Sequence, residues 1–291
     1  MEVISLAPSV DTVTTADLHL AQCAVAALLQ ELDAYPKPGL VSQVDSGSHS
    51  DMDYALMCRS SHALFHPFAK LAAAGREAGS FENVLVPLGL LAEKEMLLAT
   101  AGVNSHRGAI FSLGMILAAL ALTESRDRPL TPPEVRATLL ATWGEALNAH
   151  AVSGHLGPSH GALVRRTTGS GGARVEAARG FPGIFEIGVP AYREARSSGL
   201  DFNASRILTL FVLMEAVEDT NVIFRGGPEA ADFVRRAAGQ FLAEGGCHRE
   251  DWFGRAEELH REFIQRHLSP GGSADLLSGT LLVASTCLPD H

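Results

Sequence analysis

Side chains that could do chemistry gather in five short polar segments of a chain that is otherwise rich in apolar residues. Each segment carries carboxylates or cations and abuts the end of an apolar stretch with helical spacing. Carboxylate oxygens are the ligands that Mg²⁺ prefers, and arginine forks bind phosphate oxygens. These residue types fit a polyphosphate site that uses Mg²⁺, although plain salt bridges would use the same ones. The segments are 36–54, 102–107, 172–182, 218–227 and 269–275.

In a compact helical domain, loops at the ends of core helices can converge on one crevice, so we expect the five polar segments to meet there. The carboxylates that they carry are Asp45, Asp51, Asp53, Glu176, Asp219 and Asp275, and the cations are Lys37, Arg107, Arg174, Arg179 and Arg225.

The segment 36–54 is the longest of the five. Its two prolines end a helix, since proline lacks the amide donor, and residues 45–49 then form a loop. Ser50 and Asp53 fit an acidic capping box, which predicts a helix that starts at Ser50, with Asp51 and Asp53 in its first turn near the positive end of the helix dipole. The same pattern also fits an ordinary capped helix with a solvated loop.

Apolar residues recur at helical spacing along the chain, and no run alternates convincingly as a strand would. We therefore expect an all-α fold in a single compact domain over residues 1–291, with buried central helices, an active-site crevice at helix ends and a poorly ordered segment at 1–13. The predicted helices cover about 14–35, 50–71, 85–101, 108–123, 131–148, 203–217, 229–243, 250–267 and 276–287, with a kink near Pro67 and a cap at Asn203.

The charge balance gives no general attraction to polyanions. With 23 basic and 33 acidic side chains the formal charge is −10, so we expect neither nucleic acid nor an anionic membrane as a partner. The uncharged helix predicted at 108–123 is shorter than the roughly 20 residues of a bilayer span. The four cysteines form no CxxC pair and no signal peptide is evident, which together indicate a cytoplasmic protein.

Five groups of motifs resemble the successive motifs of the triphosphoribosyl-dephospho-coenzyme A synthase family. They occur in family order over residues 36–282, and such a five-part match is far more specific than any single motif. Ser105 and Arg107 stand where threonine and lysine are expected, and they keep the hydroxyl group and the charge. The motifs are PKPGLV with VDSGSHSDM, then GVNSHRGAIFSLG, GARVEAARGFP, EDTNVIFRGG and SPGGSADLLSGTL.

This resemblance implies a pentosyltransferase with ATP and 3′-dephospho-coenzyme A as substrates. The acceptor ribose hydroxyl would replace adenine at the anomeric carbon of ATP and leave the triphosphate intact. The product, 2′-(5″-triphosphoribosyl)-3′-dephospho-coenzyme A, is the precursor of the prosthetic group on the acyl-carrier subunit of malonate decarboxylase or citrate lyase. We expect a stand-alone synthase of the malonate decarboxylase branch, whose product a separate transferase passes to an acyl-carrier protein.

Breaking a glycosidic bond builds positive charge on the ribose, so we expect one carboxylate to stabilise the transition state and another to act as general base. A histidine could hydrogen-bond the departing adenine. The candidate catalytic residues are Asp45, His49, Asp51 and Asp219; the candidates for binding substrate and phosphate are Lys37, Ser48, Asn104, His106, Arg107, Arg179, Asn221, Arg225 and Ser273; and the candidate Mg²⁺ ligands are Asp51, Glu176, Asp219 and Asp275.

Two other readings stay open from the residues. A metal-dependent, all-helical hydrolase of N-glycosidic bonds, of the ADP-ribosyl hydrolase type, would also gather aspartates at helix ends, with water in place of the acceptor hydroxyl. A helical scaffold that only binds a partner protein explains the apolar helices but not the five polar segments. A homodimer is compatible with each of these readings.

Overall fold

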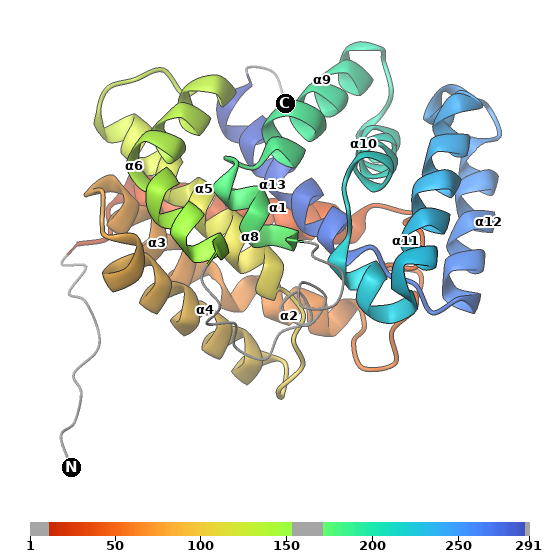
Figure 1. The fold of residues 1–291 in the computed structure, drawn as a ribbon, viewed down its shortest axis with the longest axis horizontal. Coiled ribbons are helices and arrows are strands. Elements are labelled where there is room, and N and C mark those ends of the chain that lie inside the picture. The colour runs from red at the N-terminus through yellow and green to blue at the C-terminus, as the bar shows by residue number, and fades with distance from the viewer. Residues whose placement is uncertain (1–11, 153–170, 289–291) are drawn as a thin grey trace.

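The computed structural model describes residues 12–152 and 171–288, in which the regular structure is helical and contains no strand (Figure 1). This confirms the predicted all-α fold, while residues 1–11 of the predicted N-terminal segment lie outside the described ranges. The α-helices are α1 (Thr15–Asp33), α2 (Tyr54–Ala63), α3 (Phe65–Arg76), α4 (Val86–Ala99), α5 (Arg107–Ser125), α6 (Pro132–Val152), α8 (Gly172–Ala178), α9 (Val189–Ser197), α10 (Phe202–Ala216), α11 (Thr220–Ala243), α12 (Trp252–Gln265) and α13 (Gly271–Cys287), with π-helical turns η1 (Phe81–Leu85) and η2 (Gly183–Gly188) and a 3-10 turn η3 (Gly246–His248).

Helix α5 is the central element of the core, as its lack of charge predicted. It packs against α1, α3, α6 and α13. Small residues permit this close packing: a Cβ on Gly75 of α3 would lie 2.2 Å from the Cα of Ala118. The helix is long and apolar enough to cross a membrane, with a mean hydropathy of 1.6, but 78% of that window is buried inside the protein. Its composition is therefore that of a core helix.

Helices α1 and α13, which lie near opposite ends of the described chain, pack against each other and against α5 (Figure 1). On α13, Leu277, Leu282 and Val283 are completely buried. Each such side chain contributes roughly 1.5–3 kcal/mol when it leaves water. This packing sets the position of the first turns of α13, which carry predicted site residues.

Helix α2 begins at Tyr54, so the predicted start at Ser50 is wrong. Asp53 is the N-cap, and its carboxylate accepts a hydrogen bond from the Leu56 N–H at 2.7 Å. Asp51 therefore lies in the preceding loop and Asp53 flanks the first turn. Serine and aspartate cap helices about equally well, so the pattern could not choose between the two positions.

Helices α11 and α13 begin before their predicted starts at residues 229 and 276. Asp219 caps α11, and Gly227, at φ 75°, kinks the helix before it resumes at the predicted start. Helix α13 begins at Gly271, so Ser273 and Asp275 lie within its first turns rather than in a preceding turn.

Two further local predictions are corrected. Asp201, not Asn203, caps α10, with its carboxylate 2.7 Å from the Ala204 N–H. Asn203 instead exchanges hydrogen bonds with the backbone of Tyr35 at 3.0 and 2.6 Å, which ties the chain after α1 to α10. The segment after Gly171, expected as a turn, is the short helix α8, which packs against α6 and α5.

Candidate active site

All five polar segments line one cavity of about 1200 Å³. Their convergence follows from the fold, because each segment lies at the start or end of a helix that packs against α5 or against its neighbour α13. Three predicted residues, Asp45, Ser48 and Ser273, are not among the lining residues. The predicted residues that line the cavity are Lys37, His49, Asp51, Asn104, His106, Arg107, Glu176, Arg179, Asp219, Asn221, Arg225 and Asp275.

Asp219 is held rigidly at the start of α11. One carboxylate oxygen accepts the Asn221 N–H at 2.9 Å, and the other accepts the Ser273 N–H at 2.8 Å and the Ser273 hydroxyl at 3.1 Å. Ser273 is fully buried, so it positions Asp219 and does not face a ligand. Burial raises the pKa of Asp219 against the opposing effect of these hydrogen bonds.

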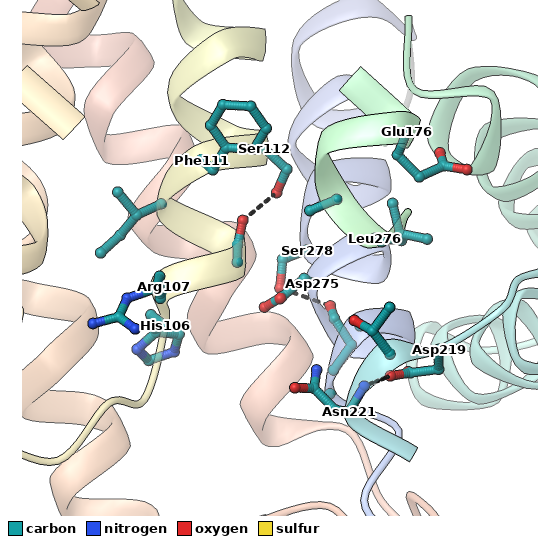
Figure 2. Close-up of a pocket in the computed structure, with 18 of the residues that line it drawn as sticks. His106, Arg107, Phe111, Ser112, Glu176, Asp219, Asn221, Asp275, Leu276 and Ser278 are labelled. Atoms are coloured by element: carbon teal, nitrogen blue, oxygen red, sulfur yellow. Dashed lines mark hydrogen bonds between the residues drawn. The ribbon is translucent and has the colours of Figure 1, made fainter. Parts of the chain in front are cut away.

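Asp275 lies on α13 between the start of α5, with His106 and Arg107, and the start of α11, with Asp219 (Figure 2). It takes the space that a side chain at position 108 would need, because a Cβ on Gly108 would lie 2.0 Å from Asp275 Oδ2. Desolvation, and then the nearby carboxylates of Asp219 and Glu31, raise the pKa of Asp275 well above its usual range. Carboxylates held this close favour a shared proton or a cation.

The donor set of Asp219 and Asp275 fits Mg²⁺, which takes oxygen ligands. Among residues 12–152 and 171–288, no three His, Cys, Asp or Glu side chains lie close enough to hold a metal ion. The other two predicted ligands lie elsewhere: Glu176 accepts the Gly183 N–H at 2.9 Å, and Asp51 is exposed on its loop. The protein would therefore supply one or two carboxylates, as in nucleotide sites where phosphate and water complete the shell.

His106, at the N-cap of α5, presents a neutral imidazole to the cavity. Its Nδ1 lies 2.6 Å from the Ser60 hydroxyl, which is 2.7 Å from the Ser105 hydroxyl. Burial, and then the charge of Lys37, lower the pKa of His106 to about 4. Such an imidazole can donate or accept a hydrogen bond at neutral pH without carrying charge.

Lys37 is paired inside the protein and is not a free phosphate ligand. Its ammonium lies 2.6 Å from the Glu31 carboxylate and donates to the Glu31 carbonyl at 2.7 Å, and the lysine is only 1% exposed. Burial lowers the pKa of Lys37, and Glu31 opposes that shift. The positive charge that was predicted for Lys37 as a phosphate ligand is therefore largely neutralised by Glu31.

His49 and Arg225 form a second polar wall. The Arg225 guanidinium lies 3.1 Å from His49 Nδ1, and His49 Nε2 lies 2.8 Å from the Ser269 hydroxyl. Asp51 approaches His49 at 3.6 Å but is largely exposed. Burial, and then Arg225, lower the pKa of His49, so this histidine also favours the neutral form.

Asp45 and Ser48, predicted as site residues, hold the loop that carries the site. The carboxylate of Asp45 lies 3.0 Å from His260 Nε2, and His260 Nδ1 lies 2.6 Å from the Lys37 carbonyl. The Ser48 hydroxyl donates to the Leu268 carbonyl at 2.6 Å. These bonds fasten the loop to α12 and the chain that follows it.

The mouth of the cavity carries exposed and half-exposed polar groups. Arg107 lines the cavity and donates from Nε to the Glu93 carboxylate of α4 at 2.9 Å. Arg179, at the end of α8, and Asn104 are exposed there. Donors of this kind can bind phosphate oxygens and still exchange with water.

Comparison with known proteins shows to which family the chain belongs. The family model described as CitG: ATP:dephospho-CoA triphosphoribosyl transferase matches residues 17–289. The chain belongs to the CitG family. The match includes every segment that lines the cavity, and it confirms the resemblance drawn from the motifs and the assignment of the chain as a transferase.

CitG-family relatives are similar over almost their whole length. One from Acinetobacter calcoaceticus is 37% identical, covering 91% of this chain and 90% of the relative; one from Azotobacter vinelandii is 38% identical with the same coverage; and one from Pseudomonas fluorescens strain Pf0-1 is 34% identical, covering 97% and 96%. Each is named a probable 2-(5″-triphosphoribosyl)-3′-dephosphocoenzyme-A synthase. No solved structure matches the chain.

Three residues that build this CitG-family site were missed from the sequence. Glu31 is the partner of Lys37, Ser60 bonds His106, and His260 bonds Asp45. Glu31 gave a usable signal, because it lies one helical turn from the buried Leu28 and beside Leu32, and a charged residue at such a position needs a partner. Ser60 and His260 gave none, since their partners are far away in the sequence.

Proposed function

We propose that this chain joins ATP to 3′-dephospho-coenzyme A and releases adenine, giving 2′-(5″-triphosphoribosyl)-3′-dephospho-coenzyme A. The proposal is supported by the printed names of the relatives and by the family match. The observation that carries it is one cavity lined by two neighbouring carboxylates, those of Asp219 and Asp275, and by cationic side chains at its mouth. The reaction needs both features, because carboxylates stabilise the positive charge that develops on the ribose and cationic side chains bind the phosphates.

In the proposed reaction the bond between C1′ of the ATP ribose and adenine N9 breaks, and the acceptor hydroxyl oxygen forms a new bond to C1′. Positive charge develops on the ribose, so Asp219 or Asp275 stabilises it. The second carboxylate accepts the hydroxyl proton, for which burial has raised its pKa in the useful direction. The departing adenine takes up one proton, so the atoms balance.

His106 is suited to the adenine rather than to the phosphates. A buried neutral imidazole forms hydrogen bonds to ring nitrogens without a charge to neutralise, and the bond to Ser60 fixes its ring. Arg107, Arg179 and Arg225 are left to bind the triphosphate. Mg²⁺, held by the carboxylate that does not accept the proton, would offset the charge of the triphosphate when bound.

The same proposal extends to the physiological setting. A cytoplasmic enzyme of the malonate decarboxylase branch would release its product to a separate transferase acting on an acyl-carrier protein. The preference for this branch over citrate lyase rests on the motif resemblance alone, and the homodimer stays a prediction.

Chromatography of reactions lacking one component at a time tests the proposed activity. With purified protein, ATP, Mg²⁺ and dephospho-coenzyme A, we expect adenine and a heavier coenzyme adduct in equal amounts, and neither when either substrate is omitted. Release of adenine or ribose products without the acceptor would instead indicate an N-glycosidic hydrolase.

A further inference from the structure

The cavity extends into an apolar compartment that takes no part in the proposed chemistry. We call it the apolar channel. It is bounded by η1, by one face of α4 and by the second and third turns of α5. The apolar side chains that define it are Phe81, Leu85, Val86, Leu90, Phe111 and Met115. A polar ring also lines the cavity there, that of His150, which lies 5.3 Å from the Phe81 ring and 6.0 Å from the Phe111 ring.

The face of α4 that lines the channel is left open. Val86, Gly89, Leu90 and Glu93 line the cavity at helical spacing. Among residues 12–152 and 171–288, no atom lies within 4 Å of a Cβ placed on Gly89, and Leu90 is 60% exposed although it is a large apolar residue. A glycine inside a helix costs roughly 0.5–1 kcal/mol relative to alanine, and at position 89 it leaves this stretch of the cavity wall without a side chain.

The channel leads away from the charged end along α5. Phe111 and Met115 follow Arg107 by one and two helical turns, and at about 1.5 Å per residue this places Met115 roughly 12 Å further along the axis. The whole cavity, at about 1200 Å³, exceeds the roughly 300–1,000 Å³ of a pocket for one small ligand. It has room for two substrates and a compartment for an uncharged, extended group.

We propose that the apolar channel binds the pantetheine arm of dephospho-coenzyme A; this assignment rests on the proposed function. Both substrates contain adenosine and phosphates, so the part of the cavity that carries the carboxylates and the cationic side chains cannot distinguish them. The acceptor alone carries a long uncharged arm with apolar methyl and methylene groups. An apolar channel beside the reacting carboxylates therefore selects the acceptor and directs its ribose toward Asp219 and Asp275.

Filling the channel tests the assignment. Gly89→Leu places a side chain in open space, so it should block the arm without disturbing the fold. Gly254→Leu on α12 is the matched control, because a Cβ on Gly254 also meets no atom of the described residues within 4 Å and Gly254 does not line the cavity. In Gly89→Leu we expect KM for dephospho-coenzyme A to rise about tenfold or more, the effect of about 1.4 kcal/mol, with KM for ATP and kcat close to wild type.

A second pair of variants and a fragment of the acceptor sharpen the test. Leu90→Ser should raise the same KM, whereas Leu98→Ser should not, since Leu98 lies on the same helix and is 68% exposed but does not line the cavity. With wild-type protein, 4′-phosphopantetheine should compete with dephospho-coenzyme A and not with ATP. Gly89→Leu should weaken this inhibition.

The outcomes separate this assignment from the proposed function. Wild-type protein that makes no adduct would overturn both. An active wild type together with a folded Gly89→Leu variant whose KM for dephospho-coenzyme A is unchanged, or whose KM for ATP rises instead, would overturn the channel assignment alone. An equal effect of Gly254→Leu would also overturn it.

Discussion

Asp219 has both of its carboxylate oxygens occupied by hydrogen bonds from the protein, yet it faces the cavity. Its geometry is therefore set before any substrate arrives. The desolvation that raises its pKa is the cost of that position, and such perturbed groups concentrate at functional sites.

Replacing Asp219 by Asn should abolish synthesis while the fold persists. We expect kcat to fall by about 10²–10⁴, the usual contribution of a positioned carboxylate. One hydrogen bond from Ser273 or Asn221 would face an amide N–H₂, which costs about 1–3 kcal/mol, and circular dichroism with thermal unfolding would measure that loss. Asp53→Asn, at the N-cap of α2, is the control, and wild-type turnover of the Asp219 variant would remove this residue from the site.

His106 should make the protein acid-sensitive. Its pKa is about 4 in the folded protein and about 6.5 when unfolded, so between these values the unfolded chain binds a proton that the folded one does not. Stability present above pH 6.5 is then lost as pH falls toward 4, by up to about 3 kcal/mol. Urea unfolding at pH 7.5 and 4.5 should show a smaller loss in His106→Gln than in wild type.

The control for this experiment is His19→Gln, which removes an exposed histidine of α1. It should lose stability with pH as wild type does. If the His106 variant does the same, the buried neutral imidazole is not the cause of the acid sensitivity.

Among the site residues, those with a charged side chain in a polar segment could be predicted from the sequence. Those whose role depends on a partner far away in the chain could not. Asp219, Asp275 and Arg225 line the cavity as expected. Asp45 has the same residue type, but folding places a buried histidine, His260, beside it. Residue type could not reveal that pairing, because the two positions come together only when α12 docks on the loop.

At the scale of elements, α13 and α5 approach each other where position 108 of α5 has no side chain and a carboxylate of α13 fills that space. Asp275 occupies the volume of a Cβ at Gly108. Elsewhere on α5 the neighbours meet through packed apolar side chains. The catalytic geometry is thus part of the contact between two core helices.

Two glycine-to-alanine variants, Gly108→Ala and Gly89→Ala, separate this contact from helix propensity, which favours alanine by about 1 kcal/mol in both. Gly108→Ala should displace Asp275, lower kcat about tenfold or more and fail to stabilise the protein. Gly89→Ala should raise stability by about 0.5–1 kcal/mol, because nothing obstructs the methyl group. Thermal unfolding and turnover measure both, and equal behaviour of the pair would contradict the contact.

Helix periodicity predicted the elements well and their starts poorly. The uncharged run at 108–123 predicted a core helix, and it forms most of the buried helix α5. The predicted starts were wrong where several capping residues compete, as before α2. Helix α9 was missed, and so was α8, because the glycines of α8 favour a turn. Contacts with α5 and α6 override that local preference.

At the scale of the whole molecule, the cavity joins segments from across the described chain, between Glu31 and Ser278. No single element carries the site. A ligand that contacts several of these segments binds the folded state alone, and so it stabilises the entire chain.

ATP with Mg²⁺ should therefore raise the unfolding free energy, by an amount that grows with the logarithm of the ATP concentration above the dissociation constant. At about 100 times the dissociation constant the gain is about 2.7 kcal/mol, measurable as a shift of the urea midpoint with the slope unchanged. AMP, which lacks the outer phosphates, should give a smaller shift. No shift at any ATP concentration would mean that the folded chain does not bind ATP.

The packing of α1 against α13 has a consequence for the time course of folding. Helices form within microseconds, but a contact between the two ends of the described chain closes a very long loop, and such contacts slow folding. Because Asp275 is carried on α13, ellipticity at 222 nm should recover early during refolding, while synthesis should recover only when α13 docks. The lag between the two signals would measure how late this molecule becomes an enzyme.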